Sequence, residues 1–119
     1  MIIPQSNIPK TRNVVLPQPE KDRINDFLQG AVYCWCKNRE QEWFSLRDLM
    51  GGDNYDWTHT PLSALYNKQV NEGAADPVKE AGKECGRLLI EVIINDARNF
   101  ETKIEELIRK YHWINSNVP

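Results

Sequence analysis

The sequence predicts an all-α fold, a single-domain bundle of about five helices with an extended, proline-rich N-terminal arm. Three observations favour this class. Apolar residues recur at the three- and four-residue spacing of a helix face from residue 22 onward. Serine, threonine or aspartate precedes several of these segments, and proline twice occupies the first helical position. The length of 119 residues is that of one domain. We expect an arm over 1–20, a helical domain over 21–114 and a flexible tail over 115–119.

The composition is that of a globular protein, with 40% hydrophobic and 27% charged residues. The net charge of −2 excludes a uniformly basic surface that coats nucleic acid, although it leaves room for a local basic patch. No apolar run approaches the length of a membrane span, so we expect no membrane contact. The three cysteines are an odd number within helical patterns, which indicates reduced thiols and a cytoplasmic protein.

The N-terminal arm carries four prolines and short apolar clusters, which favour an extended chain. It is also locally basic, through Lys10 and Arg12 and the nearby Lys21 and Arg23. Two interpretations stay open. The arm packs its apolar clusters on the body, which we favour, or it binds phosphate or an acidic partner.

Two helices are expected in the first half of the domain. The first covers residues 22–38. Its inward face consists of apolar residues at helical spacing: Ile24, Phe27, Leu28, Ala31 and Trp35. The second covers 45–50, where Ser45 is a natural N-cap and Asp48 takes the capping-box position. Gly51-Gly52 ends it, because glycine tolerates the left-handed conformation after a helix.

The third predicted helix covers residues 61–70, with Thr60 as its cap and Pro61 at its first position. The fourth begins at Asp76-Pro77 and keeps a helical period for more than four turns. Its inward stripe consists of Val78, Ala81, Cys85, Leu88, Leu89, Val92 and Ile93. Residues 88–94 are β-branched enough for a buried strand, but the unbroken period favours helix. Gly82 and Gly86, one turn apart, leave a notch that we assign to packing rather than to a ligand.

The fifth predicted helix covers residues 100–113 and begins after Asn99. Its expected inward stripe is Phe100, Ile104, Leu107, Ile108 and Tyr111. On the outer face, the pairs Glu105 with Arg109 and Glu106 with Lys110 have the favourable i,i+4 order.

No constellation of residues indicates catalysis, a metal or a cofactor. Cys34 and Cys36 would point about 200° apart on a helix, so they cannot share one ion. The segment from Asp53 fails the calcium-loop pattern at its third and twelfth positions. A carboxylate at Glu91 would become a functional candidate only if it were buried. We therefore expect a protein that is not an enzyme.

Binding to another macromolecule is the remaining class of function. Residues 45–70 have the order of a helix-turn-helix, which predicts a small regulatory protein that contacts double-stranded DNA. The expected nucleic-acid-binding residues are Arg47, Ser63, Asn67, Lys68, Gln69 and, from the arm, Lys10 and Arg12. Two features count against this interpretation. The connection is about nine residues where three or four are usual, and the recognition helix has one positive charge.

The alternative is a protein-interaction or inhibitor module that binds a larger protein through the loop over residues 51–61. Tryptophan and tyrosine are common anchors of protein interfaces. The expected protein-binding residues are Tyr55, Trp57, His59 and Trp113. The sequence favours the DNA contact narrowly and leaves a homodimer open. If Trp57 is instead packed on the core, the loop is a connection held by its aromatic residues.

Overall fold

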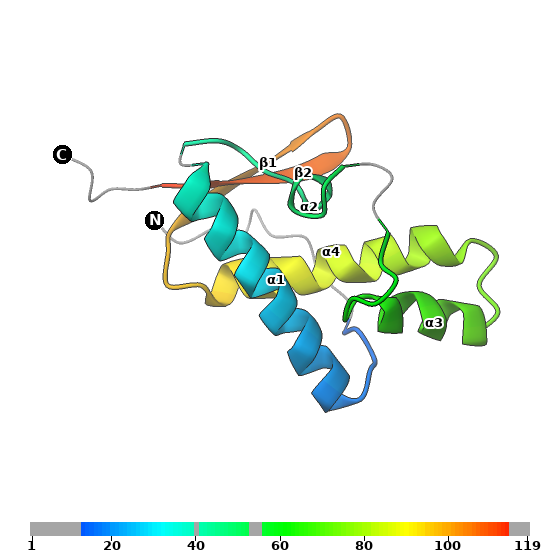
Figure 1. Cartoon of the computed structure of the whole chain (residues 1–119). Helices are drawn as coiled ribbons and strands as arrows, with labels where there is room; N and C mark the ends of the chain where they lie inside the picture. Colours follow the sequence, from blue (N-terminus) through cyan, green and yellow to red (C-terminus); the bar gives the residue numbers. More distant parts are fainter. Residues whose placement is uncertain (1–12, 40, 53–55, 115–119) are drawn as a thin grey trace.

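The computed structural model describes residues 13–39, 41–52 and 56–114. In this part of the chain, four helices are followed by a two-stranded antiparallel sheet (Figure 1). The elements are α1 (Gln18–Asn38), α2 (Leu46–Leu49), α3 (Ser63–Asn71), α4 (Pro77–Asn95), β1 (Phe100–Glu105) and β2 (Ile108–Trp113). The predicted all-α bundle of five helices is therefore wrong, because the expected fifth helix is a β-hairpin.

α4 is the central element of the fold. It begins where predicted, with the Asp76 carboxylate accepting a hydrogen bond from the backbone N–H of Lys79, and residues 88–94 are helical. Most of its predicted stripe is buried: Ala81, Cys85, Leu88, Leu89, Val92 and Ile93. Val78 is the exception, since 69% of its surface is exposed. It lies in the first turn of α4, on the side that faces away from the core.

The other helices pack on two sides of α4. In Figure 1, α1 crosses α4 at an angle and α3 lies along the N-terminal half of α4. α1 buries Ile24, Leu28, Val32 and Cys36, a stripe shifted slightly from the predicted one, so Phe27 and Trp35 lie at the edge of the core. Ahead of α1, Val14 is buried and Leu16 packs against the core. The predictions for residues 1–12 and 115–119 lie outside the described part of the chain.

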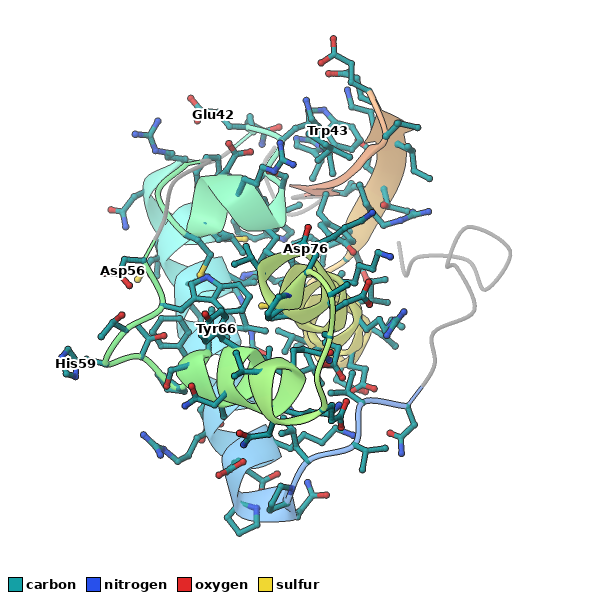
Figure 2. The ribbon with its side chains drawn as sticks, turned by 90° about the vertical axis from the view of Figure 1, so that its right-hand side faces the viewer. Glu42, Trp43, Asp56, His59, Tyr66 and Asp76 are labelled. Atoms are coloured by element: carbon teal, nitrogen blue, oxygen red, sulfur yellow. The ribbon has the colours of Figure 1, made fainter. Side chains whose placement is uncertain are left out.

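The hairpin lies on the opposite side of α4 from α3 (Figures 1 and 2). Its register pairs Phe100 with Trp113 and Thr102 with Tyr111. Phe100 and Tyr111 are buried as predicted, but Ile104 is 61% and Leu107 98% exposed. The expected i,i+4 ion pairs do not form. Instead, Lys110 on β2 contacts Glu105 on β1 at 2.7 Å, across the two strands.

The sequence did not predict the hairpin, because the apolar residues of 100–113 fit the period of a helix as well as that of a strand. Phe100, Thr102 and Ile104 alternate with charged residues, as in a strand, while the same segment also matches a helical stripe. The two-residue turn Glu106-Leu107 has positive φ at both positions, 53° and 66°. Such turns normally carry Asn-Gly, so the usual sequence signal of a hairpin is absent here.

The packing of α2 and α3 gives the predicted helix-turn-helix-like unit little support. The predicted capping box at the start of α2 is confirmed, because Ser45 and Asp48 exchange both hydrogen bonds. However, α2 has only four residues, and the main packing partner of α3 is α4. Gly51 and Gly52 follow at φ 95° and 120°, as expected for a helix terminator. α3 thus packs mainly on α4 rather than on α2, and the DNA contact stays a prediction.

Candidate functional site: a basic groove beside α4

A groove of about 900 Å³ runs between α4, α2 and the hairpin. We call it the α4–hairpin groove. Its lining consists of Ser45, Leu46, Arg47, Asp76, Val78, Lys79, Gly82, Lys83, Gly86, Arg87, Leu89, Ile90, Leu107, Ile108, Arg109 and Tyr111. Figure 2 looks onto the start of α4, marked by Asp76, with the hairpin above it and α3 below.

The outward face of α4 forms one wall as two adjacent rows. Lys79, Lys83 and Arg87 follow at four-residue intervals and line the groove. Because α4 is an α-helix, successive members of this row are separated by about 6 Å along the axis. The second row begins at Val78 and continues through Gly82 and Gly86 to Ile90. A row of positive charge therefore runs beside a row of small and apolar residues, and we call this second row the floor of the groove.

The opposite wall adds two more cations and further apolar surface. Arg47 is exposed on α2, and Arg109 on β2 donates a hydrogen bond to the Thr102 hydroxyl at 2.9 Å. Leu107 lies at the hairpin tip with 98% of its surface exposed. A hydrogen-bonded bridge between Phe44 and Tyr111, with both N···O distances at 2.8 Å, connects this wall to the segment before α2.

Charge is distributed unevenly between the groove and the rest of the molecule. Among the described residues, five basic side chains line the groove but only one acidic side chain does. That one is Asp76, whose carboxylate caps α4. Glu80 reaches Lys83 from outside at 3.4 Å, but both side chains are about half exposed, which makes the pair weak. The groove is thus a cationic, partly apolar surface on an acidic chain.

The predicted DNA-reading face of α3 is used inside the molecule. Glu84 on α4 is buried and accepts hydrogen bonds from the Lys68 ammonium and the Gln69 amide. Gln69 is itself buried at 8% exposure. Neither side chain is therefore available to a base edge without breaking this cluster. Glu91, which would have been a functional candidate only if buried, is partly exposed, and the buried acid of α4 is Glu84.

The remaining expected nucleic-acid contacts do not share one surface. Ser63 and Asn67 line a separate depression between α1 and α3, where Arg23 and Lys68 are balanced by Glu20 and Glu72. Arg47 lies in the α4–hairpin groove instead. Lys10 and Arg12 lie outside the described residues. Among the described residues, the structure thus places Arg47 apart from Ser63, Asn67 and Lys68, whereas Ser63 and Asn67 also line a second depression with Trp57 and His59.

The loop over residues 51–61 is held to the body by its tryptophan. Trp57 is partly buried and packs against the core. His59 is exposed at φ 65°, and Figure 2 shows His59 and Asp56 projecting away from the helices. Hydrogen bonds from Thr58 lower the pKa of Asp56, so this carboxylate is ionised at neutral pH. Tyr55 and Asp53 lie outside the described residues.

Trp113, the fourth expected interface residue, lies in a stacked cluster near the end of β2. The Arg98 guanidinium is 4.4 Å from the ring centroid of Tyr33 and 5.3 Å from that of Trp113. Asp96 holds the same arginine at 3.3 Å and accepts a hydrogen bond from Gln29 of α1 at 2.6 Å. Trp113 therefore connects the hairpin to the ends of α1 and α4, and it is separated from Trp57.

The groove cations Lys79, Lys83, Arg87 and Arg109 were not among the sequence-predicted site residues. The row on α4 is readable in the sequence, because VKEAGKECGR places its three cations four residues apart. The opposite wall could not be predicted, because residues 100–113 were expected to form a helix rather than a hairpin. The groove itself appears only when the hairpin is folded against α4.

In the described part of the chain, no three His, Cys, Asp or Glu side chains converge as metal ligands. Nor does any helix there combine the length and apolar character of a membrane span. Comparisons with known proteins return no matching family model, curated protein or solved structure.

Proposed function

We propose that this protein is a non-catalytic binding protein that takes up an acidic, amphipathic segment of a protein partner in the α4–hairpin groove. The observation that carries the proposal is the composition of that groove. Five cations line the groove, Val78 is exposed on the α4 side and Leu107 is exposed on the opposite wall. A ligand that fits offers carboxylates to the row of Lys79, Lys83 and Arg87 and apolar side chains to the floor, because opposite charges attract and apolar surface is favourably removed from water.

A protein segment suits this lining better than DNA does. Phosphate backbones offer charge but little apolar surface, and groove-reading proteins use exposed polar side chains for base edges. Here the Gln69 amide and the Lys68 ammonium of α3 are occupied by Glu84. Single-stranded nucleic acid binds through stacking on exposed aromatic rings, but Tyr111, the aromatic residue among those lining the groove, is buried.

A direct binding measurement tests the proposal. The probe is a fluorescent synthetic peptide of about 18 residues, long enough for about five helical turns. It carries leucine at i, i+3, i+4 and i+7 positions and glutamate between them. We expect micromolar binding by fluorescence anisotropy, and affinity that falls with salt because ion pairs contribute to it. Tighter binding of a DNA duplex than of the peptide would contradict the proposal.

Charge reversal locates the binding surface. Arg87→Glu should weaken binding of the peptide about tenfold or more, since it removes one favourable contact and introduces a repulsive one. Lys37→Glu is the matched control, because Lys37 is exposed on α1 and does not line the groove. It makes the same change in net charge and should leave the affinity within about twofold. Equal effects of the two variants would mean that the groove is not the site.

A further inference from the structure

Gly82 and Gly86 occupy the floor of the α4–hairpin groove without an internal reason to be glycine. Both lie in the interior of α4, where φ is not in the left-handed region. A Cβ added at either position would meet no heavy atom within 4 Å outside the helix backbone itself. Glycine in a helix interior is destabilising relative to alanine. Close internal packing, which the sequence suggested as the role of this notch, is therefore not what these two residues provide.

The two glycines instead leave the backbone of α4 bare along the groove. They lie one turn apart on the same face and directly beside the row of Lys79, Lys83 and Arg87. A side chain at either position would hold a partner away from the helix. Without one, a partner backbone can approach α4 closely while its carboxylates stay within reach of the neighbouring cations.

We propose that the partner segment binds as an acidic amphipathic α-helix whose backbone lies directly over Gly82 and Gly86. This inference rests on the proposed function and specifies its ligand. The spacing of charges favours a helical partner, because the groove cations on α4 recur every four residues. A partner helix with carboxylates at i and i+4 repeats the same interval of about 6 Å and turns its apolar face to the groove floor.

The experiment compares alanine variants by thermal unfolding and by binding of the acidic peptide. The double variant Gly82→Ala/Gly86→Ala should melt about 5 °C higher, because alanine favours helix and meets no obstacle. The same variant should bind the peptide at least about tenfold more weakly, since two methyl groups now separate the helices. A protein that becomes more stable while it loses binding is the specific signature of this inference.

Gly30→Ala is the matched control. Gly30 is also in a helix interior with no heavy atom within 4 Å of an added Cβ, but it lies on α1, outside the groove. It should raise the melting temperature and leave peptide affinity unchanged. If the double variant binds the peptide as well as the unaltered protein does, or if it melts lower, the inference is overturned.

A second peptide tests the helical conformation. Proline placed at the centre of the acidic peptide breaks its helix and should reduce affinity at least about tenfold, whereas an extended ligand would bind nearly as before. The two proposals fail separately. If affinity depends on Arg87 but not on Gly82 and Gly86 or on the proline, the groove stands and the helix over the glycines does not. If the unaltered protein does not bind the acidic peptide, both are contradicted.

Discussion

Glu84 on α4 holds the Lys68 ammonium on α3 in an ion pair that is largely removed from solvent, with side-chain exposures of 7% and 16%. Gln69 donates a second hydrogen bond to the same carboxylate. α3 is thereby attached to α4 through polar groups as well as through its buried Leu65. Lys68 and Gln69, which we expected to contact DNA, are therefore the side chains that attach α3 to α4.

Removal of this carboxylate should be costly. Glu84→Ala leaves Lys68 and Gln69 without their acceptor at a buried position, so we expect the free energy of unfolding to fall by about 3 kcal/mol. Urea denaturation measures this. Glu80→Ala removes an exposed carboxylate one turn earlier, paired only with Lys83, and should change stability by less than about 1 kcal/mol. Similar losses in both variants would mean that Glu84 does not hold α3.

The loop before α3 should depend on Trp57. Because this ring packs on the core, Trp57→Ala is expected to lower the free energy of unfolding by about 2 kcal/mol, less than for a fully buried tryptophan. Tyr66→Ala, at a ring that is 41% exposed, should cost less than about 1 kcal/mol. Unchanged chemical denaturation of Trp57→Ala would show that the indole is free for an interface, as the sequence alternative required.

The hairpin turn predicts a stabilising substitution. Leu107 has φ 66°, a conformation that costs an L-residue about 1 kcal/mol and glycine almost nothing. Leu107→Gly should therefore raise the free energy of unfolding by up to about 1 kcal/mol. Leu107→Ala keeps the unfavourable φ and serves as the control. If glycine is no better than alanine in thermal unfolding, the two-residue turn at 106–107 is not formed.

Alkaline pH should weaken the fold through Cys85. Burial raises the pKa of this thiol from 9.0 to about 12. Between these values the unfolded chain has lost the proton and the folded protein retains it. The stabilisation is fully present below about pH 9 and is lost as pH rises toward about 12, by about 1.4 kcal/mol per pH unit.

Denaturation across that alkaline range tests the assignment. Cys85→Ala should lose stability less steeply with pH than the unaltered protein does. Cys34→Ala should keep the full slope, because Cys34 is exposed. The burial of Tyr111 also raises its pKa, so some alkaline dependence should persist in both variants. Identical slopes for all three proteins would contradict a buried Cys85.

Local signals in the sequence were sufficient for the starts of α2 and α4 and for the length of α4. They were not sufficient for α1, which begins at Gln18 rather than at 22, or for α3, which begins at Ser63 without the predicted Thr60 cap. The Ser45–Asp48 box and the Asp76 cap act over three residues, and the α4 stripe repeats over many turns. The hairpin was not predictable in the same way, because segment 100–113 fits both periods and its turn lacks glycine. The α3 surface was misjudged because its partner, Glu84, lies 15 and 16 residues further along the chain. Similarly, the row of cations on α4 was predictable from the sequence, but the opposite wall of the groove forms only when the hairpin folds.

The most direct test of the central claim exchanges the charge on both sides of the groove. The triple variant Lys79→Glu/Lys83→Glu/Arg87→Glu should lose binding of the glutamate–leucine peptide in fluorescence anisotropy. It should gain binding of a peptide in which lysine replaces each glutamate, while the unaltered protein shows the reverse preference. Retained preference for the acidic peptide in the triple variant would contradict the assignment of the α4–hairpin groove as the binding site.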